Sequence, residues 1–188
     1  MQLCNRKVWD RIMERKIVIC DDDLIEAKKA QDIIERFEES IGESFSITVY
    51  TDGNKLVDDC KNGNINPNMV FMDVELEDEN GIEIAKEINM ILPKCQIVYL
   101  SNYLKYATEA YQTNHIYFVI KPELEKRLLE IHEKISKSEQ EEKKVLMLEL
   151  RKNRYEAIKK SDILYIERKG RVSYIYTKIE NYETHSKL

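Results

Sequence analysis

The sequence predicts an α/β fold, in which helices cover both faces of a doubly wound, five-stranded parallel sheet, followed by a small β-rich module. Short apolar runs alternate with amphipathic helical patterns through most of the chain. Near the C-terminus, closely spaced strand-like runs replace this alternation, as is typical of antiparallel structure. The 188 residues leave room for one full domain and a short second module.

The predicted strands of the parallel sheet are separated by helices, as in successive βαβ units. Five apolar runs are expected to form the sheet: Lys16–Cys20, Ser46–Tyr50, Met69–Met72, Gln96–Leu100 and Ile116–Ile120. Between and after them, apolar side chains recur at the spacing of helices with one buried face. Crossovers between parallel strands are right-handed, so a ligand site is expected beyond the carboxyl ends of the strands.

We divide the chain into four segments. Residues 1–15 are interpreted as an N-terminal extension outside the fold, and residues 16–135 as the α/β domain. The polar residues 136–144 predict a linker or an exposed helix extension. Residues 145–188 contain four closely spaced apolar runs, Val145–Leu150, Tyr155–Ile158, Ile163–Ile166 and Val172–Thr177, and predict a partial β-rich module.

Charge is distributed unevenly between these segments. The composition, 43% hydrophobic and 35% charged, is that of a soluble globular protein. Residues 145–188 hold 10 Lys/Arg and 6 Asp/Glu, a net charge of +4. Because the whole chain has a net charge of −5, the other residues together carry −9. An acidic body with a basic tail fits a cation-binding or phosphate-handling front and a polyanion-facing back, although solvated surface charge is the more frequent explanation of such a pattern.

The cysteines and the N-terminal segment bear on the cellular compartment. Cys4, Cys20, Cys60 and Cys95 are far apart and form no CxxC pair, so neither a zinc site nor a disulfide framework is indicated. No stretch approaches the roughly 20 apolar residues needed to span a bilayer, and polar residues interrupt Met1–Arg15 too often for a signal peptide. We therefore expect a cytoplasmic protein that does not engage a membrane.

Acidic side chains gather at two predicted strand ends. Asp21, Asp22 and Asp23 follow the first strand, and Asp73 follows the third. Asp23, with Glu26 three residues later, predicts a capping box at a helix start. Asp21 and Asp22 need a different explanation, because adjacent carboxylates repel each other and a hard cation such as Mg²⁺ would offset that repulsion.

A hydroxyl and an ammonium group are predicted at the same edge of the sheet. Ser101 ends the fourth strand, and Lys121 ends the fifth, so both should converge on Asp73. Taken singly, Ser101 could be a helix-start residue, Lys121 a solvated charge and Asp73 a turn former. Their order along the chain, after an acidic pair, favours a functional site.

With this order the chain resembles a two-component receiver domain, and the resemblance covers about residues 16–135. It implies a flavodoxin-like fold and a response regulator that a sensor histidine kinase phosphorylates on Asp73. Mg²⁺ would be held by Asp22, with Asp21 in support, by Asp73 and by the backbone carbonyl of Glu75. A carboxylate is a competent nucleophile toward an activated phosphoryl group.

The same resemblance assigns the remaining site residues. Ser101 would hydrogen-bond the phosphoryl group, Lys121 would pair with it, and Phe118 would be the rotating switch residue. Two departures from the family pattern, Asn102 and Tyr103 after the hydroxyl residue, are expected to restrict access to the phosphoryl group. Phosphorylation-dependent homodimerisation is a further expectation.

The tail resembles the opening of the LytTR DNA-binding domain. The resemblance lies in Asp162–Glu167 and the basic residues after it, Arg168, Lys169 and Arg171. It implies control of transcription, with those three basic residues contacting promoter DNA. Because this module is too short to bury a good core and its one basic loop offers only these three cations, we expect weak or absent DNA binding by this chain.

Two alternatives stay open at this stage. A haloacid-dehalogenase-like phosphatase also uses a strand-end Asp nucleophile, a Lys and Mg²⁺. In that family the nucleophile belongs to an Asp-x-Asp motif on the first strand and the acidic pair comes near the end, whereas in this chain the acidic pair comes first. The other alternative is a receiver that acts only through protein partners, with a non-functional remnant as its tail. Whether the receiver controls transcription or acts only through protein partners, we expect a phosphoacceptor signalling protein and not an enzyme.

Overall fold

The computed structural model describes residues 15–77, 79–151 and 154–185. The segment predicted as an N-terminal extension therefore lies outside the described residues, except that Arg15 is already part of the first strand and pairs with Phe45. The chain divides into two compact units, Met1–His132 and Glu133–Leu188. This boundary falls inside the helix α6 (Leu124–Lys143).

Five parallel strands form the sheet of the first unit, as the sequence predicts. They are β1 (Arg15–Cys20), β2 (Phe45–Tyr50), β3 (Met69–Asp73), β6 (Gln96–Ser101) and β7 (Tyr117–Ile120). Their order across the sheet is β2-β1-β3-β6-β7, and every neighbouring pair is parallel. The order reverses between β1 and β3, so the carboxyl ends of these two strands flank the crevice where ligands of such sheets bind.

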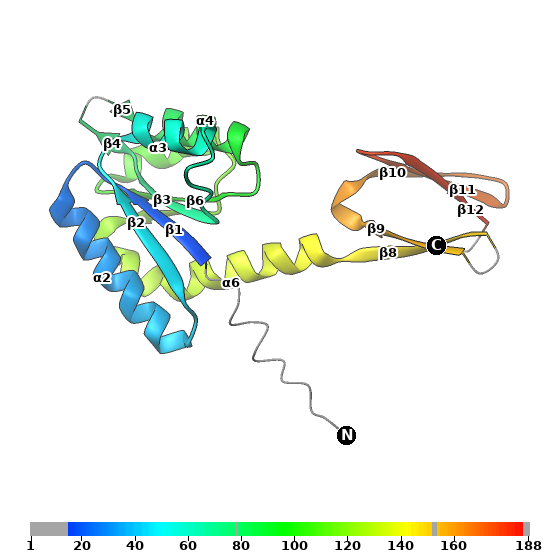
Figure 1. Cartoon of the computed structure of the whole chain (residues 1–188), viewed down its shortest axis with the longest axis horizontal. Coiled ribbons are helices and arrows are strands. Elements are labelled where there is room, and N and C mark those ends of the chain that lie inside the picture. The colour runs from blue at the N-terminus through cyan, green and yellow to red at the C-terminus, as the bar shows by residue number, and fades with distance from the viewer. Residues whose placement is uncertain (1–14, 78, 152–153, 186–188) are drawn as a thin grey trace, which may run out of the picture. The chain divides into compact units, whose positions relative to one another are not determined.

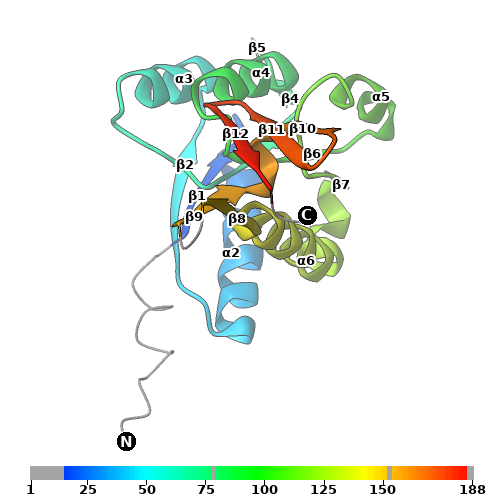
Figure 2. The same cartoon turned by 90° about the vertical axis from the view of Figure 1, so that its right-hand side faces the viewer.

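Helices cover both faces of this sheet (Figures 1 and 2). They are α2 (Leu24–Ile41), α3 (Gly53–Lys61), α4 (Gly81–Ile91), the single turn α5 (Ala107–Ala110) and α6 (Leu124–Lys143), with the 3-10 turns η1 (Leu104–Tyr106) and η2 (Lys121–Glu123). Figures 1 and 2 show α2 and α6 on one face of the sheet and α3 and α4 on the other. The fold is thus doubly wound.

Burial follows the pattern expected of a central parallel strand. All five residues of β3 are buried, because the helical layers exclude water from both faces of the strand. On the α3 and α4 side, Val70 and Met72 pack into a core with Leu56 and Ile88. The last strand residue, Asp73, is the one polar member of this run, and the buried strand fixes its position.

Helix α2 begins at a side-chain cap. Asp23 is the N-cap residue, and its Oδ1 accepts hydrogen bonds from the N–H groups of Ile25 at 2.8 Å and Glu26 at 3.4 Å. A capping box also requires the Glu26 side chain to accept a hydrogen bond from Asp23 N–H, and this part of the prediction is wrong. Asp23 N–H donates instead to Asp21 Oδ1 at 3.1 Å, and Glu26 pairs with Lys29. The nearby Asp21 carboxylate replaces the glutamate in that role.

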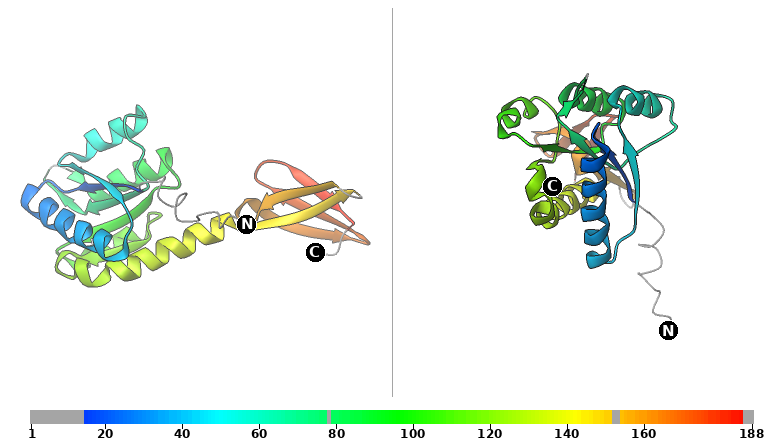
Figure 3. Two further views of the ribbon diagram at one scale, coloured as in Figure 1. Left: turned by 60° about the horizontal axis from the view of Figure 1, so that its bottom comes forward. Right: turned by 90° about the vertical axis from the view of Figure 1, so that its left-hand side faces the viewer.

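The second unit is a small antiparallel β structure (Figure 3). A hairpin of β8 (Val145–Arg151) and β9 (Arg154–Lys159) accompanies a three-stranded sheet of β10 (Ile163–Lys169), β11 (Val172–Thr177) and β12 (Asn181–Thr184), with the turn η3 (Lys160–Asp162) between them. Thr184 Oγ1 donates to the Glu149 carbonyl at 2.6 Å, which joins β12 to β8. Leu148, Ile158 and Ile175 form the small core.

The polar segment 136–144 is helical almost to its end, since α6 runs to Lys143. Its helix-extension interpretation therefore describes the structure better than a linker does. None of the helices in the described ranges is both long and apolar enough to cross a lipid bilayer.

Candidate functional site

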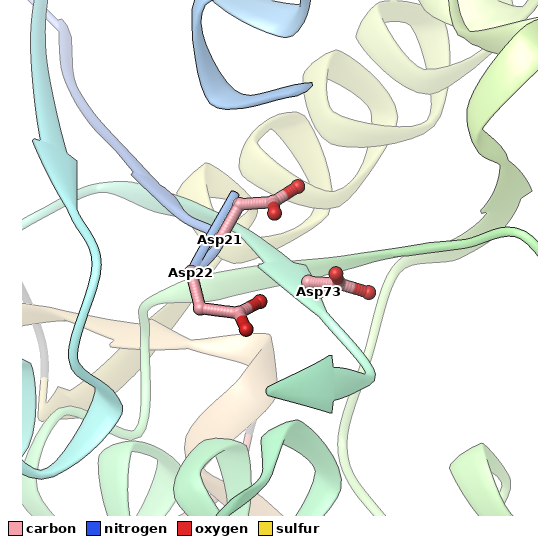
Figure 4. A group of neighbouring side chains, drawn as sticks. All are labelled: Asp21, Asp22 and Asp73. Carbon is pink, nitrogen blue, oxygen red and sulfur yellow. The ribbon is translucent and has the colours of Figure 1, made fainter. Parts of the chain in front are cut away.

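Three carboxylates meet at the carboxyl edge of the parallel sheet (Figure 4). Asp21 and Asp22 follow β1 directly, and Asp73 ends the adjacent strand β3. One oxygen of each carboxylate lies within 4.8 Å of the others. Asp21 and Asp73 are buried, and Asp22 is exposed. The sequence placed these residues together because parallel strands end at a common edge.

Lys121 brings positive charge to this cluster. It is the first residue of η2, immediately after β7, and its Nζ lies 2.7 Å from Asp73 Oδ2 and 2.7 Å from Asp21 Oδ2. Its side chain is only 10% exposed. The sequence analysis placed Lys121 next to Asp73 but did not foresee the bridge to Asp21.

Burial and charge act in opposite directions on these groups. Burial raises the pKa of Asp73 and of Asp21 above the ordinary range of a carboxyl, and the contacts with Lys121 only partly offset this. Burial lowers the pKa of Lys121, but its contacts with Asp21 and Asp73 outweigh that effect, so its pKa is raised. Three carboxylates face one ammonium group, and a hard divalent cation would complete the balance.

The loop from β3 to α4 holds two of the carboxylates in place. Glu75 N–H donates to Asp73 Oδ1 at 3.2 Å, and Glu77 N–H donates to Asp22 Oδ2 at 3.0 Å. Within this loop, β4 (Glu75–Leu76) and β5 (Glu79–Asn80) form a short antiparallel hairpin. The hairpin brings backbone of the loop to the acidic cluster, and the Glu75 position lies beside Asp73, where a main-chain carbonyl could join a cation.

Comparison with known proteins identifies the family behind this arrangement. Residues 17–133 match the family described as response regulator receiver domain. The chain belongs to that family. A receiver domain is a signalling module, and its strand-end carboxylates form the acidic pocket described above. The predicted five-stranded receiver fold is confirmed.

The curated relatives of this receiver protein are bacterial regulators. The sensory transduction protein LytT of Bacillus anthracis is 28% identical over 127 residues, which is 66% of this chain and 48% of the relative. The transcriptional regulatory protein NatR of Bacillus subtilis is 25% identical over 177 residues, 92% of this chain and 72% of NatR. The chain spans about half the length of the LytT relatives that it matches.

Solved structures agree on the fold of the receiver. The CheY-like receiver domain protein of Methanospirillum hungatei has a TM-score of 0.58 and 20% identity, covering 69% of this chain and 99% of that one. The response regulator DrrB of Thermotoga maritima has a TM-score of 0.56 and 17% identity, covering 90% of this chain and 66% of that one. At these identities the likeness shows the fold alone.

Ser101 occupies the predicted strand end in the receiver, but its hydroxyl is engaged locally. Its Oγ accepts a hydrogen bond from Tyr103 N–H at 3.0 Å and donates to the Tyr103 carbonyl at 3.3 Å. The side chain is fully buried at the end of β6. The predicted hydrogen bond of Ser101 to the phosphoryl group stays a prediction. Asn102 and the Tyr103 ring are both exposed.

Phe118 lies on β7 and is half-buried. Its ring packs against the core on the α3 and α4 side, with its centroid 6.4 Å from that of Tyr99 on the neighbouring strand. Its predicted role as the switch residue stays a prediction.

Two features near the receiver's acidic pocket escaped the sequence analysis. The Cα of Gly81, the first residue of α4, packs against the carbonyl oxygen of Asp73. The carboxylate of Glu75 accepts a hydrogen bond from the Tyr106 hydroxyl of η1 at 2.8 Å. The phrase Asn80-Gly81 signals a helix start, and nothing in the sequence links Tyr106 to Glu75.

The predicted DNA-contacting residues lie outside the receiver, around the turn between β10 and β11. Arg168 and Lys169 end β10, and Arg171 follows Gly170, whose φ of 62° is left-handed. Arg168 Nε donates to the Gly170 carbonyl at 3.3 Å, and Lys169 pairs with Glu167 at 3.1 Å. The structure thus gathers the three cations in one exposed turn, with local partners for two of them.

Proposed function

We propose that this protein is a response regulator whose receiver domain accepts a phosphoryl group on Asp73 from a sensor histidine kinase. The observation that carries the proposal is the pairing of Lys121 Nζ with Asp73 Oδ2 at 2.7 Å, inside a pocket of buried carboxylates. This geometry supplies a nucleophile and a fixed positive charge on one side of the same small site. Family membership supports the same assignment.

The chemistry proposed for Asp73 is a single phosphoryl transfer. An oxygen of its carboxylate forms a bond to phosphorus while the bond from phosphorus to the donor nitrogen of the kinase histidine breaks, and the donor keeps the electron pair. The product is an acyl phosphate. Phosphoryl transfer is catalysed mainly by positioning and by neutralising charge on the equatorial oxygens, and Lys121 is placed to do so.

The acidic pocket fits Mg²⁺ as the second source of positive charge. Asp22 and Asp73, with the backbone carbonyl of Glu75 and with Asp21 in support, would hold the ion by oxygen ligands of the kind it prefers. When bound, the ion supplies charge that offsets the carboxylates and the incoming phosphoryl oxygens. Lys121 would then be freer to leave Asp21 and to pair with the phosphoryl group.

Phosphorylation is proposed to act through the β6 and β7 surface of the receiver. The new phosphoryl oxygens would draw the Ser101 hydroxyl away from the Tyr103 backbone, because charged acceptors make stronger hydrogen bonds than a main-chain carbonyl. Movement at Ser101 would open space toward which Phe118 can turn. A surface with two states of this kind could promote a phosphorylation-dependent homodimer.

The output of the switch is proposed to be control of transcription. Relatives whose names describe sensory transduction and transcriptional regulation extend beyond the receiver, and NatR matches 92% of this chain. Arg168, Lys169 and Arg171 are the proposed DNA contacts of the second unit. Because they are three cations with local partners for two, the 188-residue chain should bind promoter DNA weakly or not at all.

The order of the site residues argues against the phosphatase alternative. The acidic pair follows β1, the proposed nucleophile ends β3 and the lysine follows β7. A haloacid-dehalogenase-like enzyme would have its nucleophile on the first strand. The alternative in which the receiver acts through protein partners alone shares the same phosphoacceptor and differs only in the output.

Uptake of a phosphoryl group from a small acyl phosphate donor with Mg²⁺ tests the proposal. The wild-type chain should gain the mass of one phosphoryl group, and Asp73→Asn should gain none. Asp23→Asn is the matched control, because asparagine also caps helices and Asp23 lies outside the carboxylate cluster. Phosphoryl uptake by Asp73→Asn equal to that of the wild type would contradict the proposal.

A further inference from the structure

A long-range hydrogen bond engages the side chain of Glu75, two residues after the proposed phosphoacceptor. Its backbone N–H donates to Asp73 Oδ1 at 3.2 Å, so the two residues are immediate neighbours in the pocket. Its carboxylate, in contrast, accepts from the Tyr106 hydroxyl at 2.8 Å. Tyr106 lies 31 residues further along the chain, in the turn η1 after β6.

The ring of Tyr106 is itself held in place. It packs, half-buried, against the core between the sheet and the helices α3 and α4. Lys105 Nζ lies 4.6 Å from the centroid of this ring and 4.9 Å from that of Tyr103. The pKa of Lys105 is raised, chiefly by its interaction with Tyr106 and further by the charge of Glu75. A fixed hydroxyl and a nearby cation thus both attract the Glu75 carboxylate.

A second contact joins the same two segments. Asn80, the strand partner of Glu75 in the β4–β5 hairpin, donates from Nδ2 to Glu109 Oε1 on α5 at 3.3 Å. The hairpin is therefore tied to the η1–α5 segment at two points, Glu75 to Tyr106 and Asn80 to Glu109. This double connection fixes the direction of Glu75 more firmly than one surface hydrogen bond would.

The charge of the pocket shows why this direction matters. Asp21, Asp22 and Asp73 already face a single ammonium group, Lys121. A fourth carboxylate turned toward Asp73 would repel an anionic phosphoryl donor and would offer a divalent cation an additional ligand. Both effects come from the same negative charge, so tighter binding of the cation and slower uptake of the phosphoryl group should appear together.

We propose that Tyr106 is a positioning residue, whose hydroxyl holds the Glu75 carboxylate out of the phosphorylation pocket and thereby sets both its Mg²⁺ affinity and its rate of phosphoryl uptake. This inference rests on the proposed function of Asp73. Tyr106 acts only through Glu75, so its effect must vanish when Glu75 has no charge.

The test compares Tyr106→Phe with the wild-type chain by calorimetric Mg²⁺ titration and by the rate of phosphoryl uptake at saturating Mg²⁺. Tyr106→Phe should bind Mg²⁺ about five- to tenfold more tightly and take up phosphoryl about five- to tenfold more slowly, the equivalent of one hydrogen bond. Tyr111→Phe is the matched control, since Tyr111 lies at the end of α5 in the same segment and its side chain is exposed. It should match the wild type.

The double variant Glu75→Gln/Tyr106→Phe separates charge from packing. It should behave like Glu75→Gln alone in both measurements. A loss of phosphoryl uptake that Tyr106→Phe causes equally in the Glu75→Gln background would reveal a packing role and overturn the proposal, as would Mg²⁺ affinity identical to that of the wild type. If the wild-type chain itself takes up no phosphoryl group, the proposed function fails, while the Mg²⁺ titrations still report on Tyr106.

Discussion

Gly81 packs against the main-chain carbonyl of Asp73 so closely that a β-carbon on Gly81 would collide with the carbonyl oxygen. The Gly81 N–H also donates to the Val74 carbonyl at 3.1 Å, which ties the start of α4 to the end of β3. The helix start thus supports the backbone of the proposed phosphoacceptor from behind. Any side chain at position 81 must displace one of the two segments.

We therefore predict that Gly81→Ala destabilises the protein by about 1–3 kcal/mol and also slows phosphoryl uptake on Asp73. Gly63→Ala serves as the control, because Gly63 has a left-handed φ of 72° but open space around its Cα. That change should cost about 1 kcal/mol from backbone strain and leave uptake unchanged. Urea unfolding and donor kinetics measure the two effects; normal uptake by Gly81→Ala would disprove the supporting role.

Removal of the positive charge of Lys121 should make the free energy of unfolding depend more strongly on pH. Burial already raises the pKa of Asp21 and Asp73, and without Lys121 the pKa of both should rise further in the folded state. When the pKa of a carboxyl in the folded protein exceeds its unfolded value of about 4, the free energy of unfolding falls as the pH rises from the unfolded pKa to the folded pKa. Lys121 remains charged throughout this range, because its own pKa is raised.

Lys121→Met should therefore be close to the wild type in stability at about pH 4 and about 3 kcal/mol less stable at about pH 7. Added Mg²⁺ should narrow the difference at neutral pH, since the ion would replace the missing positive charge. Exposed Lys126 on α6 provides the control substitution, Lys126→Met, which should show neither effect. A stability difference that is the same at both pH values would contradict the electrostatic account.

Three cysteines are predicted to resist alkylation in the folded protein. Burial raises the pKa of Cys20 and of Cys95 to about 12, and it also raises that of Cys60. At about pH 8 the reactive thiolate is then scarce, and the buried sulfur is also inaccessible. Peptide mass analysis should find these three residues unmodified by iodoacetamide until urea is added, and rapid labelling of any of them in the native protein would be inconsistent with this core.

The sequence predicted the sheet and the acidic cluster well because both depend on local patterns. The apolar runs that end at Asp21, Asp73, Ser101 and Lys121 determine which residues leave the sheet at its carboxyl edge. Parallel pairing then brings those residues together without any knowledge of side-chain conformations. The strand boundaries were displaced by only one residue, as at Arg15.

Features that depend on loop conformation could not be predicted in the same way. Glu79 accepts a hydrogen bond from Gly53 N–H at 2.9 Å and so caps α3 across 26 residues of sequence. Tyr106 meets Glu75, and the Ser101 hydroxyl turns to Tyr103, because the β3–α4 loop and η1 adopt particular backbone paths. No periodicity or motif encodes such contacts, which arise only when the loops pack.

Any DNA binding by this chain should be weak and sensitive to salt. Arg168, Lys169 and Arg171 are the proposed contacts, and three phosphate contacts correspond to a slope of about −2.7 in log K against log salt. Fluorescence anisotropy with promoter and random duplexes measures the slope and the selectivity. Substitution of Arg171 by alanine should reduce the magnitude of this slope by about 0.9, the contribution of one phosphate contact. Tight, sequence-selective binding at near-physiological salt would refute this prediction.

The most direct test of the account is the chemical identification of the phosphorylated residue. After incubation with a phosphoryl donor and Mg²⁺, borohydride reduces an acyl phosphate to the alcohol, so an aspartyl phosphate becomes homoserine. Tandem mass spectrometry of the peptide that contains Asp73, and of the separate peptide that contains Asp21 and Asp22, should find homoserine at position 73 and aspartate at positions 21 and 22. Conversion at another residue, or a phosphoryl group that resists borohydride, would contradict the assignment of Asp73 as the phosphoacceptor.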